Sequence, residues 1–356
     1  MSSSEAQVTL AIDAMGGDNG PKEVVDGLAT AIDNFSSGVE YILVGDERKL
    51  APLVKKHASL SQGPIRIHHA SEVIGMDEKP VASLKSKKDS SLVRALELVR
   101  EDDADAMLSC GNTGSLMAGG TIKLRTLEGI DRPALGTIWP GIKGYFVLLD
   151  AGANPESKPI HLLHNAVLGA NYARVVLGID EPKIGLLSIG TEESKGTELI
   201  QESHHLLKQM RGLLDYKGLL EGFHMFENQV DVVVCDGFVG NVVLKTCESL
   251  CKMIGSFLDE ELRRNTLRKT GALLSKGAFK GLKQRINPEH LGGAPLLGLR
   301  KPVVKAHGSS NRHQIEGAIR ITLEVVRKDM IGRILADARE ASELLLPIEL
   351  AVGANG

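Results

Sequence analysis

Residues 231–241 read DVVVCDGFVGN, a run of valines that ends in a polar, glycine-containing turn. A short continuous apolar run of this kind is typical of a strand buried on both faces of a sheet, whereas a half-exposed strand alternates polar and apolar residues. The same design recurs on both sides of this stretch. Further apolar runs lie at 8–15, 41–45, 65–70, 106–110, 134–140, 145–151, 183–190 and 303–308.

Segments with a helical period separate these runs. In residues 89–101, for example, Leu92, Leu96 and Val99 fall on one helical face. Strands and helices in such alternation predict an α/β fold, a three-layer α/β/α sandwich with a mostly parallel sheet.

Composition places the chain among ordinary globular proteins. Of its 356 residues, 42% are hydrophobic and 24% are charged, and the net charge of −3 gives no reason to expect nucleic-acid binding. The four cysteines form no Cys-x-x-Cys pair, which suits a reducing compartment. The N-terminus lacks the pattern of a signal peptide, and no apolar run approaches the roughly 18 residues that span a bilayer. We therefore expect a cytoplasmic protein of one domain, residues 1–356, with a flexible tail at 346–356.

One segment departs from the alternating pattern. Residues 263–288 hold eight basic residues and no acidic one, and Phe279, Leu282 and Ile286 share one helical face. We predict a protruding basic helical hairpin over 255–290. Its apolar face packs either on the domain or a second subunit, or on a membrane or partner protein, and the residues favour neither.

Glycine-rich polar turns follow six of the predicted strands. They lie at 13–18, 111–115, 150–154, 190–196, 236–241 and 306–310. In an open parallel sheet, ligands bind beyond the carboxyl ends of the strands, and a glycine turn that opens a helix presents backbone N–H groups to an anion. Six such turns together predict one shared anion-binding site. The carboxylates show no metal-ligand spacing, and no dinucleotide-binding G-x-G-x-x-G is present, so we predict neither a metal nor a cofactor.

Two cysteines and one histidine border these turns. Cys110 and Cys235 are candidates for thiol nucleophiles, but each ends an apolar run, where cysteine more often serves as a small buried hydrophobe. His307 is followed by Gly-Ser-Ser, so its imidazole and Ser309 can meet the same anion. We therefore favour His307 over either cysteine as a functional side chain.

Ten motifs stand out when the chain is considered as a whole. They are DAMGGD (13–18), HASEVIGMDEKP (69–80), KKDSS (87–91), GNTG (111–114), RPAL (132–135), LLDAGAN (148–154), KG (195–196), VVVCDGFVGN (232–241), GGAPLLG (292–298) and AHGSS (306–310). In this order they resemble the acyl-ACP:phosphate acyltransferases, the PlsX family of bacterial phospholipid synthesis. The resemblance runs from about Leu10 to about Val326.

The resemblance implies a fold related to isocitrate and isopropylmalate dehydrogenases and to phosphotransacetylases. It also implies a homodimer that forms acyl phosphate reversibly from acyl-[acyl-carrier-protein] and inorganic phosphate. The acyl phosphate then feeds a membrane-embedded glycerol-3-phosphate acyltransferase.

Beside this resemblance, the turns offer candidates for direct attack of phosphate on a thioester. We expect the substrates to bind at Asp13, Gly16, Gly17, Asn112, Thr113, Gly114 and Ser309. The catalytic candidates are Lys195, Asp236, Asn241 and His307. Asn241 would donate to the oxyanion, and Lys195, oriented by an ion pair with Asp236, would stabilise the leaving thiolate.

The resemblance also suggests a role for the basic hairpin. Members of the family associate peripherally with the membrane, and both the inner membrane surface and acyl carrier proteins are acidic. The expected membrane or carrier-protein contacts are Arg268, Lys269, Leu274, Lys276, Phe279 and Lys280.

Two rival functions stay open. The first is a metal- and nicotinamide-dependent decarboxylating dehydrogenase of the same fold class. The second is a dimeric membrane-surface scaffold without activity, against which the polar residues at the strand ends argue.

Overall fold

The computed structural model describes residues 7–35, 38–286 and 292–353, without the side chains of 283, 284, 286 and 346–353. The described strands form one sheet in the order β3-β2-β1-β4-β11-β10-β5-β6-β9-β7-β8. The strands are β1 (Val8–Asp13), β2 (Val39–Gly45), β3 (Ile65–His69), β4 (Ala106–Ser109), β5 (Ala134–Pro140), β6 (Tyr145–Leu149), β7 (Lys183–Ser188), β8 (Asp215–Glu221), β9 (Val232–Val234), β10 (Ala294–Leu297) and β11 (Val303–Lys305).

Neighbouring strands run parallel except near the middle of the sheet. There β10 is antiparallel to both β11 and β5, and β5 is antiparallel to β6. The predicted α/β class with a mostly parallel sheet is confirmed. The sequence does not predict β8 or β10, because DYKGLLE carries charges among its apolar residues and APLL is only four residues long.

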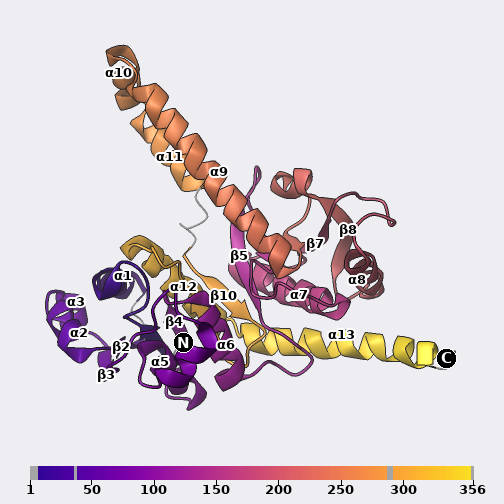
Figure 1. Ribbon diagram of the computed structural model, residues 1–356, viewed down its shortest axis with the longest axis horizontal. Coiled ribbons are helices and arrows are strands. Elements are labelled where there is room, and N and C mark those ends of the chain that lie inside the picture. The colour runs from indigo at the N-terminus through magenta and orange to yellow at the C-terminus, as the bar shows by residue number, and fades with distance from the viewer. Residues whose placement is uncertain (1–6, 36–37, 287–291, 354–356) are drawn as a thin grey trace, which may run out of the picture.

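Helices flank the sheet along its whole length (Figure 1). They are α1 (Gly20–Phe35), α2 (Glu47–Val54), α3 (Ala58–Ser61), α4 (Pro80–Ser86), α5 (Ser91–Arg100), α6 (Thr113–Leu124), α7 (Pro159–Tyr172), α8 (Glu198–Gln209), α9 (Gly237–Arg263), α10 (Thr266–Leu274), α11 (Lys276–Ile286), α12 (Arg312–Arg327) and α13 (Met330–Gly353). A π-helical turn (Ala173–Leu177) and a 3₁₀ turn (Gly222–Glu227) complete the described elements.

Side chains of one strand pack alternately on the two faces of the sheet. In β1, Leu10 and Ile12 join a buried cluster with residues of α1 and α12, while Ala11 joins a cluster with residues of α5. In β9, Val232 and Val234 pack with residues of α7, and Val233 lies in the cluster that α9 contacts. Because successive residues of a strand point to opposite faces, a strand with helices on both sides needs an unbroken apolar run.

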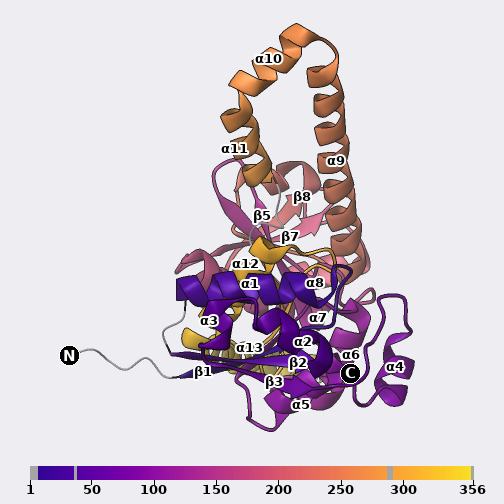
Figure 2. The same cartoon turned by 90° about the vertical axis from the view of Figure 1, so that its left-hand side faces the viewer.

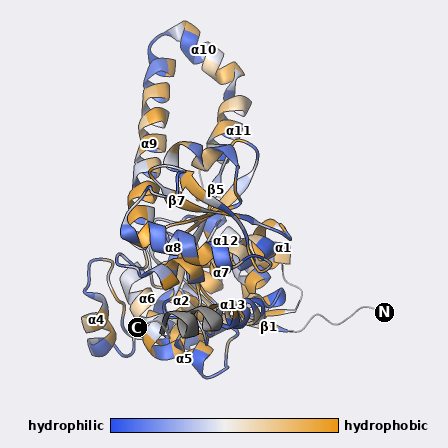
Figure 3. Ribbon diagram, turned by 90° about the vertical axis from the view of Figure 1, so that its right-hand side faces the viewer, coloured by the Kyte–Doolittle hydropathy of each residue, from blue (hydrophilic) through white to orange (hydrophobic). Residues whose placement is uncertain are grey.

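A long helical projection departs from this body. The outer part of α9 together with α10 and α11, residues 249–286, projects away from the sheet (Figures 1 and 2), and we call this segment the helical arm. Figure 3 shows apolar and polar residues interleaved along it. Its exposed large apolar side chains are Leu250, Met253, Ile254, Phe257, Leu258, Leu267, Leu273, Leu274 and Leu282.

The arm differs in two ways from the hairpin expected at 255–290. It begins earlier, because α9 runs unbroken for 27 residues from Gly237. Acidic residues of α9 also pair with some of the basic ones: Asp259 contacts Arg263 at 2.8 Å, and Glu261 contacts both Arg264 and Arg268. Residues 287–290 of the predicted hairpin lie outside the described residues.

The C-terminal part of the chain forms the long helix α13. The predicted tail at 346–356 overlaps this helix, whose backbone continues through Gly353, and 354–356 lie outside the described residues. Within the described part of the chain, no helix has the length and apolar character that crossing a bilayer requires.

Candidate active site

A cavity of about 400 Å³ lies between α9 and the carboxyl ends of β1, β4 and β11. Its polar lining combines three of the predicted site residues with others that the sequence did not single out. The polar residues are Asp18, Thr113, Thr137, Asn241, Lys245, Glu248, Lys305 and His307. Its position is the one at which α/β proteins of this kind bind ligands.

Three glycine turns interlock beneath this cavity. A Cβ atom at Gly16 would lie 2.6 Å from the backbone nitrogen of Gly111, and one at Gly17 would lie 2.9 Å from the carbonyl oxygen of Gly308. The N–H of Asp18 donates to that same carbonyl at 2.7 Å. Gly16 and Gly17 therefore let the turns after β1, β4 and β11 meet backbone to backbone, as side chains would prevent.

Asp13 and Asn112 hold these turns in shape. Asp13 is 1% exposed, and its carboxylate accepts from the Ser109 hydroxyl at 2.7 Å and the Gly16 N–H at 3.2 Å. The Asn112 side chain accepts from the Ser115 N–H at 2.8 Å and so caps α6. Neither residue lines the cavity, so both support the turns that form its wall and do not themselves face it.

The first turn of α6 opens into the cavity at Thr113. The N–H groups in the first turn of a helix have no partner within the helix, and the positive end of the helix dipole lies there, so this position favours an anion. Gly114 is needed for packing, because a Cβ there would lie 2.6 Å from Cγ of Pro80.

Lys305 is a cavity residue that the sequence analysis missed. It is 7% exposed, and its ammonium donates to the carbonyl oxygens of Cys110, at 3.2 Å, and Ala306. Burial lowers its pKa to about 8, against the attraction of Cys110, Asp13 and Asp18. The sequence did contain a signal for this residue, because Lys305 interrupts the otherwise apolar run VVKA, where a buried charge is costly unless it is paired or hydrogen-bonded.

His307 faces the cavity from the turn after β11, and Ser309 orients its ring. The Ser309 N–H donates to Nδ1 at 3.2 Å, and the Ser309 hydroxyl lies 2.8 Å from the same nitrogen. With Nδ1 acting as an acceptor, the neutral ring carries its proton on Nε2. His307 can therefore donate to a ligand through Nε2.

Asn241 reaches the cavity because α9 begins unusually close to a neighbouring turn. A Cβ at Gly240 would lie 1.8 Å from the carbonyl oxygen of Asp150. Asp236 caps this helix, since its carboxylate accepts from the Val239 N–H at 2.9 Å. The capped first turn, packed on the Asp150 turn, directs Asn241 toward the cavity.

The structure does not bring Lys195 to this cavity. Lys195 is exposed beyond the end of β7, and four strands separate β7 from β11 in the sheet. Among the described residues, no ion pair joins Lys195 to Asp236, whose carboxylate caps α9. The order of turns along the chain does not disclose the order of strands in space, so the sequence could not separate Lys195 from the other candidates.

The two cysteines at strand ends are buried, as the hydrophobic interpretation expects. Cys110 is 4% exposed, and burial raises the pKa of its thiol to about 12. Cys235 is 1% exposed, its Sγ donates to the Asp150 carbonyl at 3.7 Å, and burial likewise raises its pKa. Because the thiolate is the nucleophile, neither thiol is activated. The described residues also contain no group of three potential metal ligands.

Comparisons with known proteins agree over most of the chain. Residues 8–333 match the family model described as fatty acid synthesis protein. The phosphate acyltransferase of Geobacter sulfurreducens is 45% identical over 325 residues, which cover 91% of this chain and 92% of the relative. The phosphate acyltransferase of Thermoanaerobacterium thermosaccharolyticum is 44% identical over 325 residues, covering 91% of this chain and 95% of the relative.

Solved structures show the same fold at low sequence identity. A phosphotransacetylase from Streptococcus pyogenes superposes with a TM-score of 0.59 at 19% identity, over 90% of this chain and 94% of that chain. A branched-chain phosphotransacylase from Enterococcus faecalis gives 0.56 at 14% identity, over 90% of this chain and 99% of that chain.

Proposed function

This chain belongs to the fatty acid synthesis protein family of phosphate acyltransferases, and we propose that it forms acyl phosphate reversibly from acyl-[acyl-carrier-protein] and inorganic phosphate. The observation that carries this proposal is the cavity that joins the first turn of α6, Lys305, His307 and Asn241. Four donors meet there, and the reaction needs donors for phosphate, for an oxyanion and for a leaving sulfur.

In the proposed reaction, phosphate binds between the first turn of α6 and the Lys305 ammonium. One phosphate oxygen attacks the thioester carbonyl carbon directly. The Asn241 amide donates to the oxyanion of the tetrahedral intermediate, and loss of one such donor typically costs roughly 10²–10³ in rate. When the intermediate collapses, the carbon–sulfur bond breaks, and the sulfur takes the proton that the attacking hydrogen phosphate gives up, while the Nε2–H of His307 donates a hydrogen bond to the departing sulfur. The products are acyl phosphate and the free thiol.

The other predicted site residues have supporting roles in this proposal. Asp13, Gly16 and Gly17 shape the turn after β1. Asn112 and Gly114 set the position of the first turn of α6, and Ser309 orients His307. These contacts support the proposal that the predicted residues form one site. The role proposed for Lys195 is to stabilise the leaving thiolate, and only the family motif supports this role. The same holds for its proposed ion pair with Asp236.

We also propose that the protein is a cytoplasmic homodimer that associates peripherally with the membrane through the helical arm. Support for the membrane association comes from the exposed apolar side chains of the arm and from Lys269, Lys276 and Lys280, which form no ion pair with another residue that the structure describes, because such helices bind anionic interfaces. A position at the membrane would deliver acyl phosphate to a membrane-embedded glycerol-3-phosphate acyltransferase.

The comparisons do not favour the decarboxylating dehydrogenase, since the relatives described above are named phosphate acyltransferases and the two solved structures described above are a phosphotransacetylase and a phosphotransacylase. A deeper kinship of the fold with isocitrate and isopropylmalate dehydrogenases stays a proposal, supported by the motif resemblance.

The test is phosphate-dependent release of thiol from an acyl carrier thioester, with acyl phosphate measured as the second product. Wild-type protein is expected to release one thiol for each acyl phosphate formed, and Asn241→Ala to lower kcat by roughly 10²-fold. Asn34→Ala, at an exposed position in the last turn of α1, is the matched control. Thiol release that does not require phosphate would contradict the proposal.

A further inference from the structure

A second hollow, larger than the catalytic cavity, lies on the body between α4, α5 and α6. Its volume is about 1070 Å³, and we call it the basic groove. In Figure 2 these three helices lie together at the end of the body opposite the helical arm. The residues that line the groove are Val81, Leu84, Lys85, Lys88, Val93, Arg94, Glu97, Arg100, Gly119, Ile122, Lys123, Leu124, Arg125 and Arg300.

The charge of the groove is strongly one-sided. Seven of its lining residues are basic and only Glu97 is acidic. Four of the basic residues, Lys85, Lys88, Arg125 and Arg300, are exposed, and no ion pair joins any of them to another residue that the structure describes. A chain with a net charge of −3 thus concentrates unpaired positive charge on one surface.

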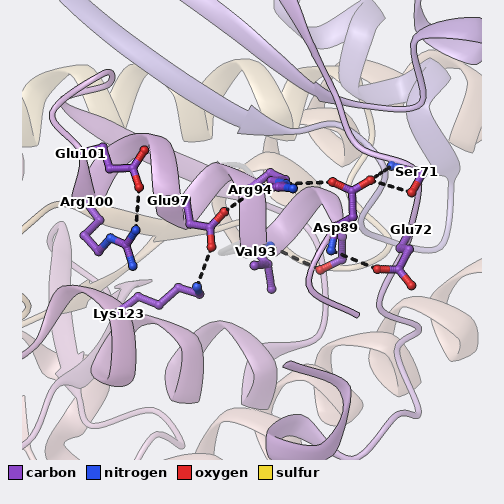
Figure 4. A network of polar contacts seen from close by, with 10 residues as sticks. Ser71, Glu72, Asp89, Val93, Arg94, Glu97, Arg100, Glu101 and Lys123 are labelled. Carbon is purple, nitrogen blue, oxygen red and sulfur yellow. Dashed lines mark hydrogen bonds and ion pairs between the residues drawn. The ribbon is translucent and has the colours of Figure 1, made fainter. Parts of the chain in front are cut away.

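Of the other basic residues, Arg94 and Lys123 belong to a network that fixes the wall of the groove, and Arg100 pairs separately with Glu101 (Figure 4). Arg94 on α5 contacts both Asp89, at 2.8 Å, and Glu97, at 3.0 Å. Lys123 on α6 reaches the same Glu97 at 2.8 Å, so α5 and α6 are joined across the groove. Hydrogen bonds from Ser71 and then Arg94 hold the pKa of Asp89 far below its usual range, so the network stays charged at any physiological pH.

Apolar side chains lie exposed among these charges. Ile122 on α6 is 64% exposed, and Val81 on α4 is 50% exposed. An apolar centre with a charged rim is the usual composition of a protein–protein interface, and a small-molecule site would enclose such side chains more fully.

The groove and the catalytic cavity are connected through α6 and through the segment that leads into α4. Thr113, in the first turn of α6, lines the cavity, and Ile122, near the other end of that helix, lines the groove. Ile122 is nine positions further along the helix than Thr113, which at a rise of 1.5 Å per residue is roughly 14 Å. The loop before α4 likewise contributes Met76 to the cavity, while α4 itself contributes Val81 to the groove. A partner seated in the groove would need a flexible arm of that length to reach the cavity.

We propose that the basic groove is the docking surface for the acidic carrier protein that presents the acyl thioester. This inference rests on the proposed function, since it names where the protein part of that substrate binds. Positive charge on the groove attracts an acidic partner, Val81 and Ile122 provide the apolar contact, and the prosthetic arm of the carrier spans the distance to the cavity. The helical arm of the enzyme is then free of the carrier and available to the membrane.

The experiment compares two substrates and two charge reversals of equal size. The substrates are an acyl carrier thioester and acyl-pantetheine, which has the same reactive group without the protein. Lys85→Glu with Lys88→Glu alters the groove, and Lys276→Glu with Lys280→Glu alters the helical arm as the matched control. Ile122→Asp tests the apolar centre, and circular dichroism checks that each variant folds.

The groove double variant is expected to raise KM for the acyl carrier thioester by about tenfold or more, and Ile122→Asp to raise it as well. For both variants kcat and the KM for acyl-pantetheine should stay at the wild-type values. The arm double variant should leave both values of KM unchanged.

An unchanged KM for the carrier thioester in the groove variants would overturn the proposal, as would an equal rise in the arm variant. If the KM for acyl-pantetheine rises as well, the substitutions affect the catalytic cavity and not the docking of a protein. If sedimentation shows a changed oligomeric state, the groove contacts a second copy of the chain. Either result overturns carrier docking. Failure of the proposed function is a separate result, in which the wild-type protein transfers no acyl group from either substrate to phosphate.

Discussion

Burial gives Lys305 a pKa of about 8, and the proposed reaction uses its positive charge to hold phosphate. The charge is therefore lost as the pH rises through about 8. We predict that kcat/KM for phosphate falls above this pH in the wild type. Lys305→Met is expected to be slow and to show no such fall, and pH–rate profiles of the two proteins measure the difference. A profile of the variant that keeps the wild-type inflection would exclude Lys305 as its source.

The same pKa shift has a consequence for stability. Below about pH 8 the side chain is protonated in both the folded and the unfolded protein, so the full penalty of its burial is present. The shift of the pKa from its ordinary value of 10.5 to about 8 corresponds to a destabilisation of the folded protein on the order of 3 kcal/mol. Between pH 8 and 10.5 the unfolded chain holds the proton more tightly, so stability rises with pH in this window. We expect Lys305→Met to unfold at higher urea concentration than wild type at pH 7, and to lose much of this advantage by pH 10.

Cys110 and Cys235 test the direct-attack mechanism. Both thiols are buried with raised pKa values, so neither is expected to carry the acyl group. The combined variant Cys110→Ala and Cys235→Ala should keep acyl-phosphate formation within severalfold of wild type, with a small loss of stability from the two cavities. Loss of all activity in a variant whose circular dichroism is native would favour a covalent acyl-cysteine instead.

At the scale of single elements, the start of α9 illustrates how a backbone contact positions a side chain. Gly240 touches the Asp150 carbonyl, and no side chain can be added there without moving the helix that carries Asn241. We predict that Gly240→Ala lowers stability by about 1–3 kcal/mol and lowers kcat, because the helix start must shift.

Gly255, on the outer part of the same helix, provides the matched control. A Cβ there meets no atom within 4 Å, and alanine favours a helix over glycine by up to about 1 kcal/mol. Gly255→Ala should therefore be slightly stabilising and fully active. Equal activity of the two variants would mean that the contact at Gly240 does not position Asn241.

The strands are the elements that the sequence predicts best. The valines at 232–234 need apolar partners on both faces, and the structure supplies α7 on one side and α9 on the other. The missed strand β8 lies at an edge of the sheet, where its exposed residues need not be apolar. The other missed strand, β10, lies inside the sheet, and its four residues are too few to form a recognisable apolar run. Sequence patterns report burial over several residues, so they reveal long apolar strands and pass over short or charged ones.

Across the whole molecule, the candidate site depends on strand order, which no local pattern contains. Thr113, Asn241 and His307 meet because β4 lies beside β11 and α9 crosses above them, whereas the equally glycine-rich turn that holds Lys195 follows a strand far from β11. Lys305 was overlooked for a related reason. The glycine-rich turns mark where a strand ends, whereas Lys305 stands at the last position of the strand itself.

The helical arm gives a prediction at this scale. Leu274 is 84% exposed on α10, and Lys269 and Lys276 lie nearby in the sequence. Leu274→Asp is expected to reduce sedimentation with anionic vesicles severalfold and to leave acyl-phosphate formation in solution unchanged. Ile142→Asp, an exposed apolar residue of the β5–β6 turn, serves as the control. Wild-type sedimentation of the Leu274 variant would remove this residue from the membrane contact.

The α6 helix, which lines the cavity with its first turn and the basic groove with its last turns, has a further consequence. A packed helix has a fixed length, so α6 sets the distance between the basic groove and the cavity. The tether of a substrate that is docked in the groove must be at least that long. A carrier whose prosthetic tether is truncated by a few bonds would still dock with normal affinity, yet its thioester would stop short of the phosphate. A longer tether would add only a modest entropic cost to placing the thioester in the cavity, because this cost grows slowly with the length of a flexible chain. The enzyme would thus behave as a molecular ruler, intolerant of short tethers and permissive toward long ones.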